Sequence, residues 1–111
     1  TYAPFKVLKS EHWVFEGTSL KNNDLFGENG MNGGGASGWE TDKITPDSPN
    51  NLVHLAKGVN PDDGGADLIY YKNQYGGQVF SVGYLTYTGA LSVDENVSRI
   101  TKNVINKFLS N

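Results

Sequence analysis

The chain has 111 residues, no cysteine and a formal net charge of −3 at pH 7. This length fits one unit, so residues 1–111 are expected to form a single domain or a domain fragment. No run of basic residues is longer than two, which argues against nucleic acid or an anionic membrane as partner. We find neither a signal-peptide pattern nor an apolar stretch long enough for a membrane span, and the compartment stays open. The lack of cysteine excludes disulfides, thiolate metal sites and cysteine nucleophiles.

The first half, residues 1–50, is expected to be irregular and rich in loops. Residues 5–8 can form a short strand, and residues 11–20 are dense in large side chains. Six of the twelve residues from 27 to 38 are glycine, which predicts a loop and leaves open a role as a flexible lid. Pro46 and Pro49 then indicate turns.

The second half, residues 51–111, predicts a strand, a hairpin and a helix in that order. Residues 51–56 predict the first strand. Residues 67–73 and 78–89 predict a pair of strands joined by the turn 74–77, whose length and glycines suit a hairpin. Residues 78–89 carry no charge and look apolar on both faces, which predicts a central strand covered on both sides. Gly83 in its middle predicts a bulge or a close approach by the final helix.

The last element is an amphipathic helix. Its apolar side chains recur at helical spacing at Val97, Ile100, Val104, Ile105 and Phe108. Ser92, followed three residues later by Glu95, fits a capping box. Together these elements favour an α/β or α+β fold, with a small sheet, a C-terminal β-hairpin and a closing helix.

Acidic and histidine side chains are the candidates for chemistry. Glu40 and Asp42 would lie on one side of an extended segment, where paired carboxylates can perform acid–base catalysis or remain solvated beside Trp39. If residues 11–16 were helical, His12 and Glu16 would share a face, as in some metal sites. The alternative is that His12 and Trp13 pack against the core.

Two further groups have structural and functional interpretations. Asp62, Asp63 and Asp67 resemble a loose calcium loop, although turn chemistry alone explains aspartate and glycine there. His54 is expected to be structural or exposed. Tyrosines around the hairpin, with Tyr84 and Tyr87 among them, can form a platform for a glycan or a protein together with Trp13 and Trp39, or can simply pack across strands.

Four blocks carry a resemblance to a known family: HWVFEGTSLKNNDLFG, GWETDK, GADLIYYKNQYGGQVFSVGYLTYTGAL and NVSRITKNVINKFL. Their order is similar to that in the C-terminal region of the N,N-dimethylformamidase large (beta) subunit family, from about residue 11 onward. The resemblance implies the terminal part of a larger class I glutamine amidotransferase-like domain. It also implies a parent enzyme that hydrolyses a small N-substituted amide with iron held by tyrosine and glutamate. Those iron ligands are expected upstream, so no cofactor or metal is expected in this chain.

Three functions follow from this resemblance and from the residues. The first is a C-terminal fragment or truncated relative that acts as a structural and interaction domain, continuing upstream of Thr1. The second is a free-standing module for a carbohydrate or protein ligand, with His12, Trp13, Trp39, Asp42, Tyr84 and Tyr87 as binding residues. The third is a small amide hydrolase with Glu16 and Glu40 as catalytic residues. Open strand edges further predict self-association or a partner chain.

Overall fold

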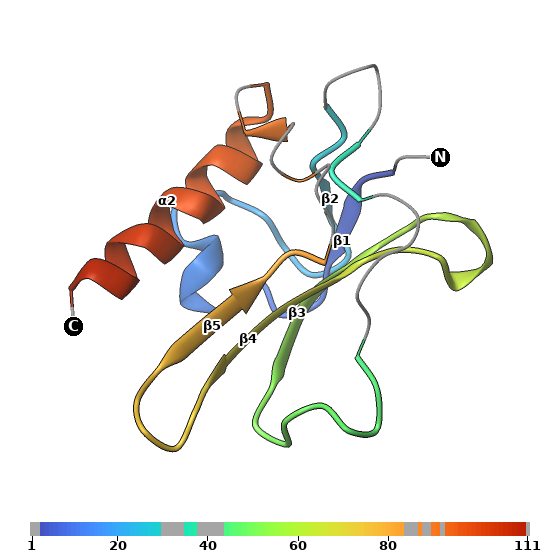
Figure 1. Cartoon of the computed structure of the whole chain (residues 1–111). Helices are drawn as coiled ribbons and strands as arrows, with labels where there is room; N and C mark the ends of the chain where they lie inside the picture. The colour runs from blue at the N-terminus through green and yellow to red at the C-terminus, as the bar shows by residue number, and fades with distance from the viewer. Residues whose placement is uncertain are drawn as a thin grey trace.

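The chain forms an antiparallel sheet with one long helix on one side (Figure 1). This computed structural model describes residues 3–29, 35–37, 44–83, 87, 90–91 and 93–110. The sheet order is β2-β1-β3-β4-β5, and every neighbouring pair is antiparallel. The elements are β1 (Phe5–Val7), η1 (Trp13–Phe15), β2 (Leu25–Phe26), β3 (Val53–Gly58), η3 (Pro61–Asp63), β4 (Asp67–Lys72), β5 (Gln78–Ser81) and α2 (Glu95–Leu109). The fold is therefore α+β, in agreement with the second of the two predicted classes.

The predicted hairpin is confirmed. β4 pairs with β5 in the register that places Lys72 opposite Gln78. The backbone N–H of Asn73 donates to the carbonyl of Gly77 at 2.7 Å, and the Asn73 side-chain oxygen accepts from the backbone N–H groups of Tyr75 and Gly77. Gly76 has a φ of +88°, a left-handed conformation that glycine adopts without the steric cost of a Cβ.

The predicted long strand over residues 78–89 is wrong. β5 ends at Ser81, and Gly83 has a φ of +76°, which turns the chain out of the ladder. Tyr87 and Ala90 have helical backbone. The strand is also not central, because β5 is the last strand in the sheet order. The β-bulge in the described sheet lies between His54 and Ala56.

The C-terminal helix is confirmed, with a different cap. The Asp94 side chain accepts from the backbone N–H groups of Asn96 at 3.0 Å and Val97 at 3.1 Å, so Asp94 is the N-cap. Ser92, the predicted cap, lies outside the described residues. No helix in the described part of the chain combines the length and the apolar character that crossing a membrane requires.

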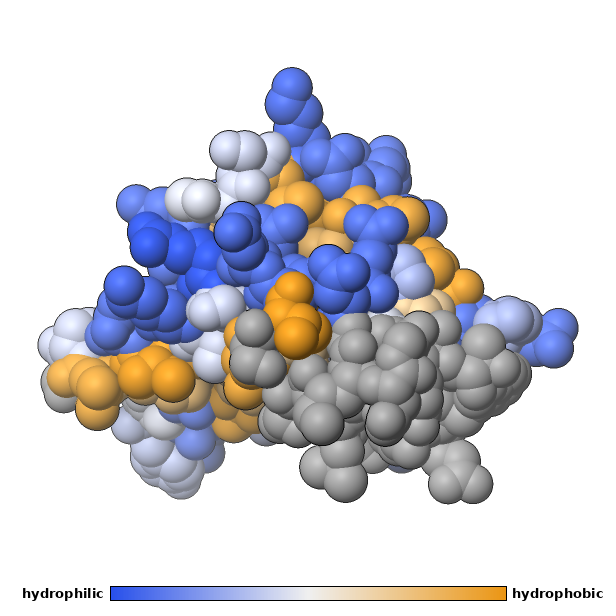
Figure 2. Space-filling view, turned by 90° about the horizontal axis from the view of Figure 1, so that it is seen from above, coloured by the Kyte–Doolittle hydropathy of each residue, from blue (hydrophilic) through white to orange (hydrophobic). Residues whose placement is uncertain are grey.

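The core lies between the sheet and the layer formed by η1 and α2. Val97, Ile100 and Val104 of α2 are buried there, whereas Ile105, which the pattern also assigned to this face, is 51% exposed. Every strand except β5 contributes buried side chains to this core, and Phe80 of β5 is half-buried. The buried strand residues of the core are Phe5, Val7, Phe26, Leu55, Ala56 and Leu68. Burial of one such large apolar side chain contributes about 1.5–3 kcal/mol. Seen from above, the described residues are mostly hydrophilic, with several hydrophobic patches among them (Figure 2).

Candidate functional site

Three aromatic side chains, from η1 with its preceding residue and from β4, meet in one cluster. The rings of His12 and Trp13 are 5.2 Å apart, His12 lies 5.4 Å from the ring of Tyr70, and Trp13 meets Tyr70 edge-on at 5.3 Å. Tyr70 comes from β4, and all three residues are half-buried. This aromatic cluster brings together two predicted binding residues, His12 and Trp13, with a tyrosine of the hairpin.

Two polar atoms of the aromatic cluster, the His12 Nδ1 and the Tyr70 hydroxyl, form hydrogen bonds within the chain. His12 precedes η1, and its Nδ1 accepts from the backbone N–H of Val14 at 3.3 Å. Burial lowers the pKa of His12 and raises the pKa of Tyr70, so both neutral forms are favoured. The Tyr70 hydroxyl donates to the side-chain oxygen of Gln78 at 2.7 Å. The Lys107 ammonium lies 5.7 Å from the centre of the Trp13 ring, a cation–π arrangement.

Glu16 serves the fold through its backbone. Its carbonyl oxygen accepts from the Asn103 side chain at 2.8 Å and from the Arg99 Nε at 3.3 Å, which links the end of η1 to α2. The Glu16 side chain is exposed. Because η1 spans only Trp13–Phe15 and Glu16 itself is non-helical, the helical face that would have paired Glu16 with His12 does not form.

Tyr87 is a core residue. Its side chain is 3% exposed and packs edge-on against Phe5 and Phe80. Its hydroxyl lies 2.9 Å from the Thr101 Oγ1. Burial raises the pKa of Tyr87 to about 12; the Thr101 hydrogen bond opposes the rise and the negative charge of Asp94 adds to it. A phenol held in this way is not available at a surface platform. The other predicted site residues, Trp39, Glu40, Asp42 and Tyr84, lie outside the described residues.

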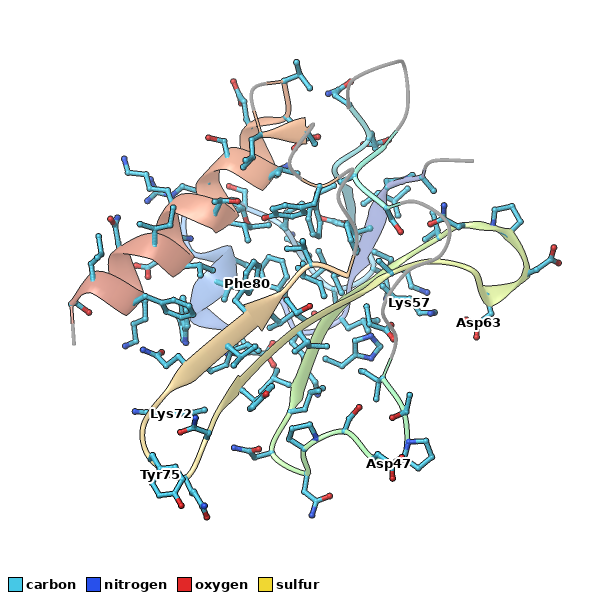
Figure 3. The ribbon with its side chains drawn as sticks, in the orientation of Figure 1. Asp47, Lys57, Asp63, Lys72, Tyr75 and Phe80 are labelled. Atoms are coloured by element: carbon cyan, nitrogen blue, oxygen red, sulfur yellow. The ribbon has the colours of Figure 1, made fainter. Side chains whose placement is uncertain are left out.

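Asp63 and Asp67, two of the three aspartates that resemble a calcium loop, form ion pairs with β3. Lys57 of β3 lies 3.1 Å from Asp63 and 3.5 Å from Asp67 (Figure 3). The Asp67 carboxylate also pairs with the His54 Nε2 at 2.9 Å and accepts from the backbone N–H of Ile44 at 2.8 Å. Within the described ranges, no group of three or more histidine or acidic side chains is arranged to hold a metal ion.

Sequence reasoning missed the pairing of His54 with Asp67. The register of β3 with β4 creates it, because Lys57 stands opposite Asp67 and a bulge follows His54. Asp67 is 6% exposed, so its three interactions compensate for the loss of hydration at a buried carboxylate. The antiparallel pairing of the two strands was a usable signal, but the bulge shifts the partners by one residue.

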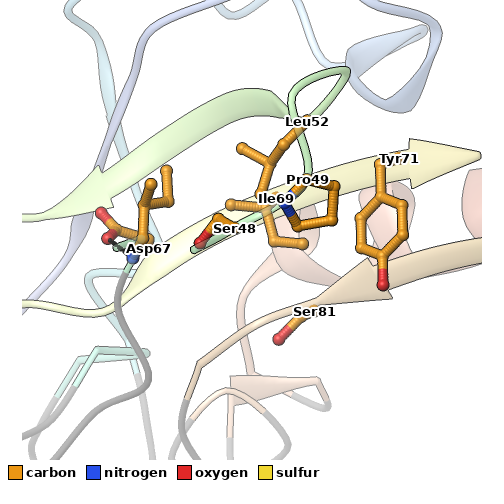
Figure 4. A pocket seen from close by; sticks show the side chains of 8 residues that line it. Ser48, Pro49, Leu52, Asp67, Ile69, Tyr71 and Ser81 are labelled. Atoms are coloured by element: carbon orange, nitrogen blue, oxygen red, sulfur yellow. Dashed lines mark hydrogen bonds between the residues drawn. The ribbon is translucent and has the colours of Figure 1, made fainter. Parts of the chain in front are cut away.

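A small pocket of about 170 Å³ lies on the sheet face opposite α2, under the segment before β3 (Figure 4). Ile44, Ser48, Pro49 and Leu52 form one wall, and Asp67, Ile69, Tyr71 and Ser81 form the other. Ligand pockets typically enclose ~300–1,000 Å³, so this one would admit only a small molecule. Sequence reasoning assigned Pro46 and Pro49 to turns and did not anticipate that this segment folds back over the sheet.

Comparison with known proteins shows the family. Residues 1–102 match the family described as N,N-dimethylformamidase beta subunit-like, C-terminal. The chain belongs to this family. It is 33% identical over 125 residues to the N,N-dimethylformamidase beta subunit of Alcaligenes sp, which covers 87% of this chain and 16% of that protein. It is 32% identical over 129 residues to the beta subunit of Paracoccus aminophilus, covering 91% of this chain and 17% of that protein.

The predicted resemblance to the dimethylformamidase family is therefore confirmed. The chain spans about one sixth of the length of these two relatives. The glutamine amidotransferase-like fold that the resemblance implied stays a prediction.

Proposed function

We propose that this chain is a structural and interaction domain of a dimethylformamidase-like protein and does not by itself form a complete catalytic site. This proposal rests on the structural roles of the polar side chains that the structure describes. His12 caps η1, Asp67 is held by three donors, and Tyr87 is a buried core residue. Each of these polar groups stabilises the fold, whereas a catalytic acid or base must reach a substrate.

The relatives support the interaction part of the proposal. Both are named as the beta subunit of N,N-dimethylformamidase, and a subunit works in contact with another chain. Large apolar side chains are exposed at the hairpin tip and on α2: Tyr75 is 87% exposed, Leu109 79% and Ile105 51%. Exposed apolar groups of this size are common at protein interfaces, with tyrosine especially frequent.

The competing proposal is a small amide hydrolase that uses Glu16 and Glu40. An assay of the purified chain with N,N-dimethylformamide, with and without added ferrous iron, separates the two proposals. We expect no release of dimethylamine above the rate of the buffer. Turnover that falls in Glu16→Gln or Glu40→Gln, while Glu11→Gln keeps the wild-type rate, would overturn the structural proposal.

A further inference from the structure

Within the residues that the structure describes, the outer edge of β5 is open for pairing. β5 ends the sheet order, and no described strand pairs with its other side. Its four residues, Gln78 to Ser81, are half-buried and uncharged. Edge strands of soluble proteins are commonly protected from further pairing by a lysine, a proline or a bulge, and β5 contains none of these.

The hairpin register identifies the backbone groups that point outward. The backbone hydrogen bond from Asn73 to Gly77 makes these two residues a hydrogen-bonded pair. Pairs alternate along an antiparallel ladder, so Lys72 and Gln78 form a non-hydrogen-bonded pair, and so do Tyr70 and Phe80. The Lys72 carbonyl accepts from the Asn51 side chain, which agrees with its pointing away from β5. Gln78 and Phe80 therefore direct their N–H and C=O groups away from β4.

The opposite edge of the sheet differs. β2 has only two residues, Leu25 and Phe26, and it directly follows Asp24. A two-residue strand offers too few backbone groups for a stable ladder, whereas β5 can offer two donors and two acceptors. Of the two edges of the described sheet, β5 is therefore the one suited to bind another strand.

We propose that β5 pairs with β5 of a second copy of this chain in antiparallel orientation, joining the two sheets. This inference rests on the proposed interaction function and names its surface. A two-fold axis through Val79 places Gln78 of one copy opposite Phe80 of the other, and their outward N–H and C=O groups match. The same surface meets itself, as a two-fold interface requires. Because β5 carries no charge, the pairing brings no like charges together.

The side chains of β5 also suit pairing with a second copy of the chain. Phe80 packs against Tyr87 on the helix side, so Val79, its neighbour in the strand, points to the opposite face with Tyr71. In the proposed register the two Val79 side chains face each other as a non-hydrogen-bonded pair, the closer of the two pair types. Two β-branched side chains in this position favour strand pairing.

Light scattering after size exclusion, over a wide range of protein concentration, tests the proposal. We expect a species of twice the 12.1 kDa of one chain. Gln78→Pro removes an outward N–H but no ladder bond to β4, and should give a monomer. Gln78→Ala is the matched control, because it loses the same side-chain bond to Tyr70 but keeps the N–H, and should remain dimeric.

A second variant and a second measurement guard against misfolding of the proline variant. Val79→Lys keeps every backbone group but places two ammonium groups face to face, and should also be monomeric, whereas Val79→Thr should stay dimeric. In the wild-type dimer, hydrogen exchange at the Gln78 and Phe80 amides should be at least about tenfold slower than in Val79→Lys. A wild-type monomer at all concentrations, or a dimer that survives both Val79→Lys and Gln78→Pro, would overturn the β5 interface. Both of these results concern the oligomeric state of the chain. They are distinct from amide turnover, which is the outcome that would overturn the proposed function.

Discussion

The hydroxyl oxygen of Tyr87 lies 2.9 Å from the Thr101 Oγ1, and this contact joins the segment after β5 to α2. The Thr101 hydroxyl in turn donates to the carbonyl of Val97 at 2.8 Å. The Tyr87 ring packs against Phe5 of β1 and Phe80 of β5. One side chain therefore connects two strands of the sheet with the helix that covers it.

Alkaline pH should weaken the fold through Tyr87. The pKa of Tyr87 is raised to about 12 in the fold, against an ordinary value of 10, so the stabilisation by its neutral form is complete below pH 10. This stabilisation declines as pH rises through 10 and is lost through about pH 12. Between pH 9 and pH 11, the free energy of unfolding of the wild type should fall by about 1 kcal/mol more than that of Tyr87→Phe. Urea unfolding of both proteins at the two pH values measures this difference. Tyr75→Phe, at an exposed tyrosine, should show no such gain, and equal behaviour of the two variants would contradict the assignment.

Asn103 should be a strong determinant of stability. Its side-chain amide donates to the carbonyls of Val14 at 2.9 Å and Glu16 at 2.8 Å, and so holds η1 against α2. We expect Asn103→Ala to lower the free energy of unfolding by about 1–3 kcal/mol, because two carbonyls lose a partner. Asn106→Ala is the matched control on the exposed side of the same helix, with the same change in helix propensity. Equal losses for the two variants in urea unfolding would show that these bonds contribute nothing.

Mildly acidic pH should weaken the fold through His12. Burial lowers its pKa below the ordinary 6.5, and its Nδ1 must stay unprotonated to accept from the backbone N–H of Val14. The unfolded chain therefore takes up a proton first, and stability falls as pH drops through 6.5 toward the lowered pKa. Asparagine at this position can cap η1 without titrating. Between pH 8 and pH 5.5, His12→Asn should lose less stability than the wild type; parallel losses would refute this role.

Two glycines should respond differently to alanine. A Cβ at Gly65 would collide with the backbone carbonyl of Gly58, where neither chain can move aside easily. A Cβ at Gly76 meets nothing within 4 Å, so only its positive φ opposes the substitution. We expect Gly76→Ala to cost about 1–2 kcal/mol and Gly65→Ala about 3 kcal/mol or more. Thermal unfolding of both variants checks this order, and the reverse order would mean that the approach of the two chain segments is looser than described.

The parts of the fold that depend on local sequence were predictable. The hairpin follows from the chemistry of residues 73–77, and α2 follows from the spacing of Val97, Ile100 and Val104. The position of β5 at the sheet edge was not predictable, because strand order depends on contacts far apart in the sequence. The end of β5 was missed because the alternating pattern continues beyond Gly83, where a single backbone angle redirects the chain.

The candidate site was predictable only in part. His12 and Trp13 were identified as neighbours with aromatic character, and the structure adds Tyr70, which β4 brings to them. The same residue types occur in binding surfaces and in packed clusters. The sequence therefore could not decide between a binding role and a packing role. The roles of Glu16 and Asp67 depend on hydrogen bonds to α2 and β3, which residue spacing along the chain does not encode.

In the proposed function, this chain contributes structure and contacts rather than complete amide-hydrolysing chemistry. The most direct test is the rate of amine release from a small N-substituted amide by the purified wild-type chain supplied with ferrous iron. We expect the rate of the buffer with iron alone. A rate that rises in proportion to the concentration of the chain, and that is lost when the chain is unfolded, would contradict it.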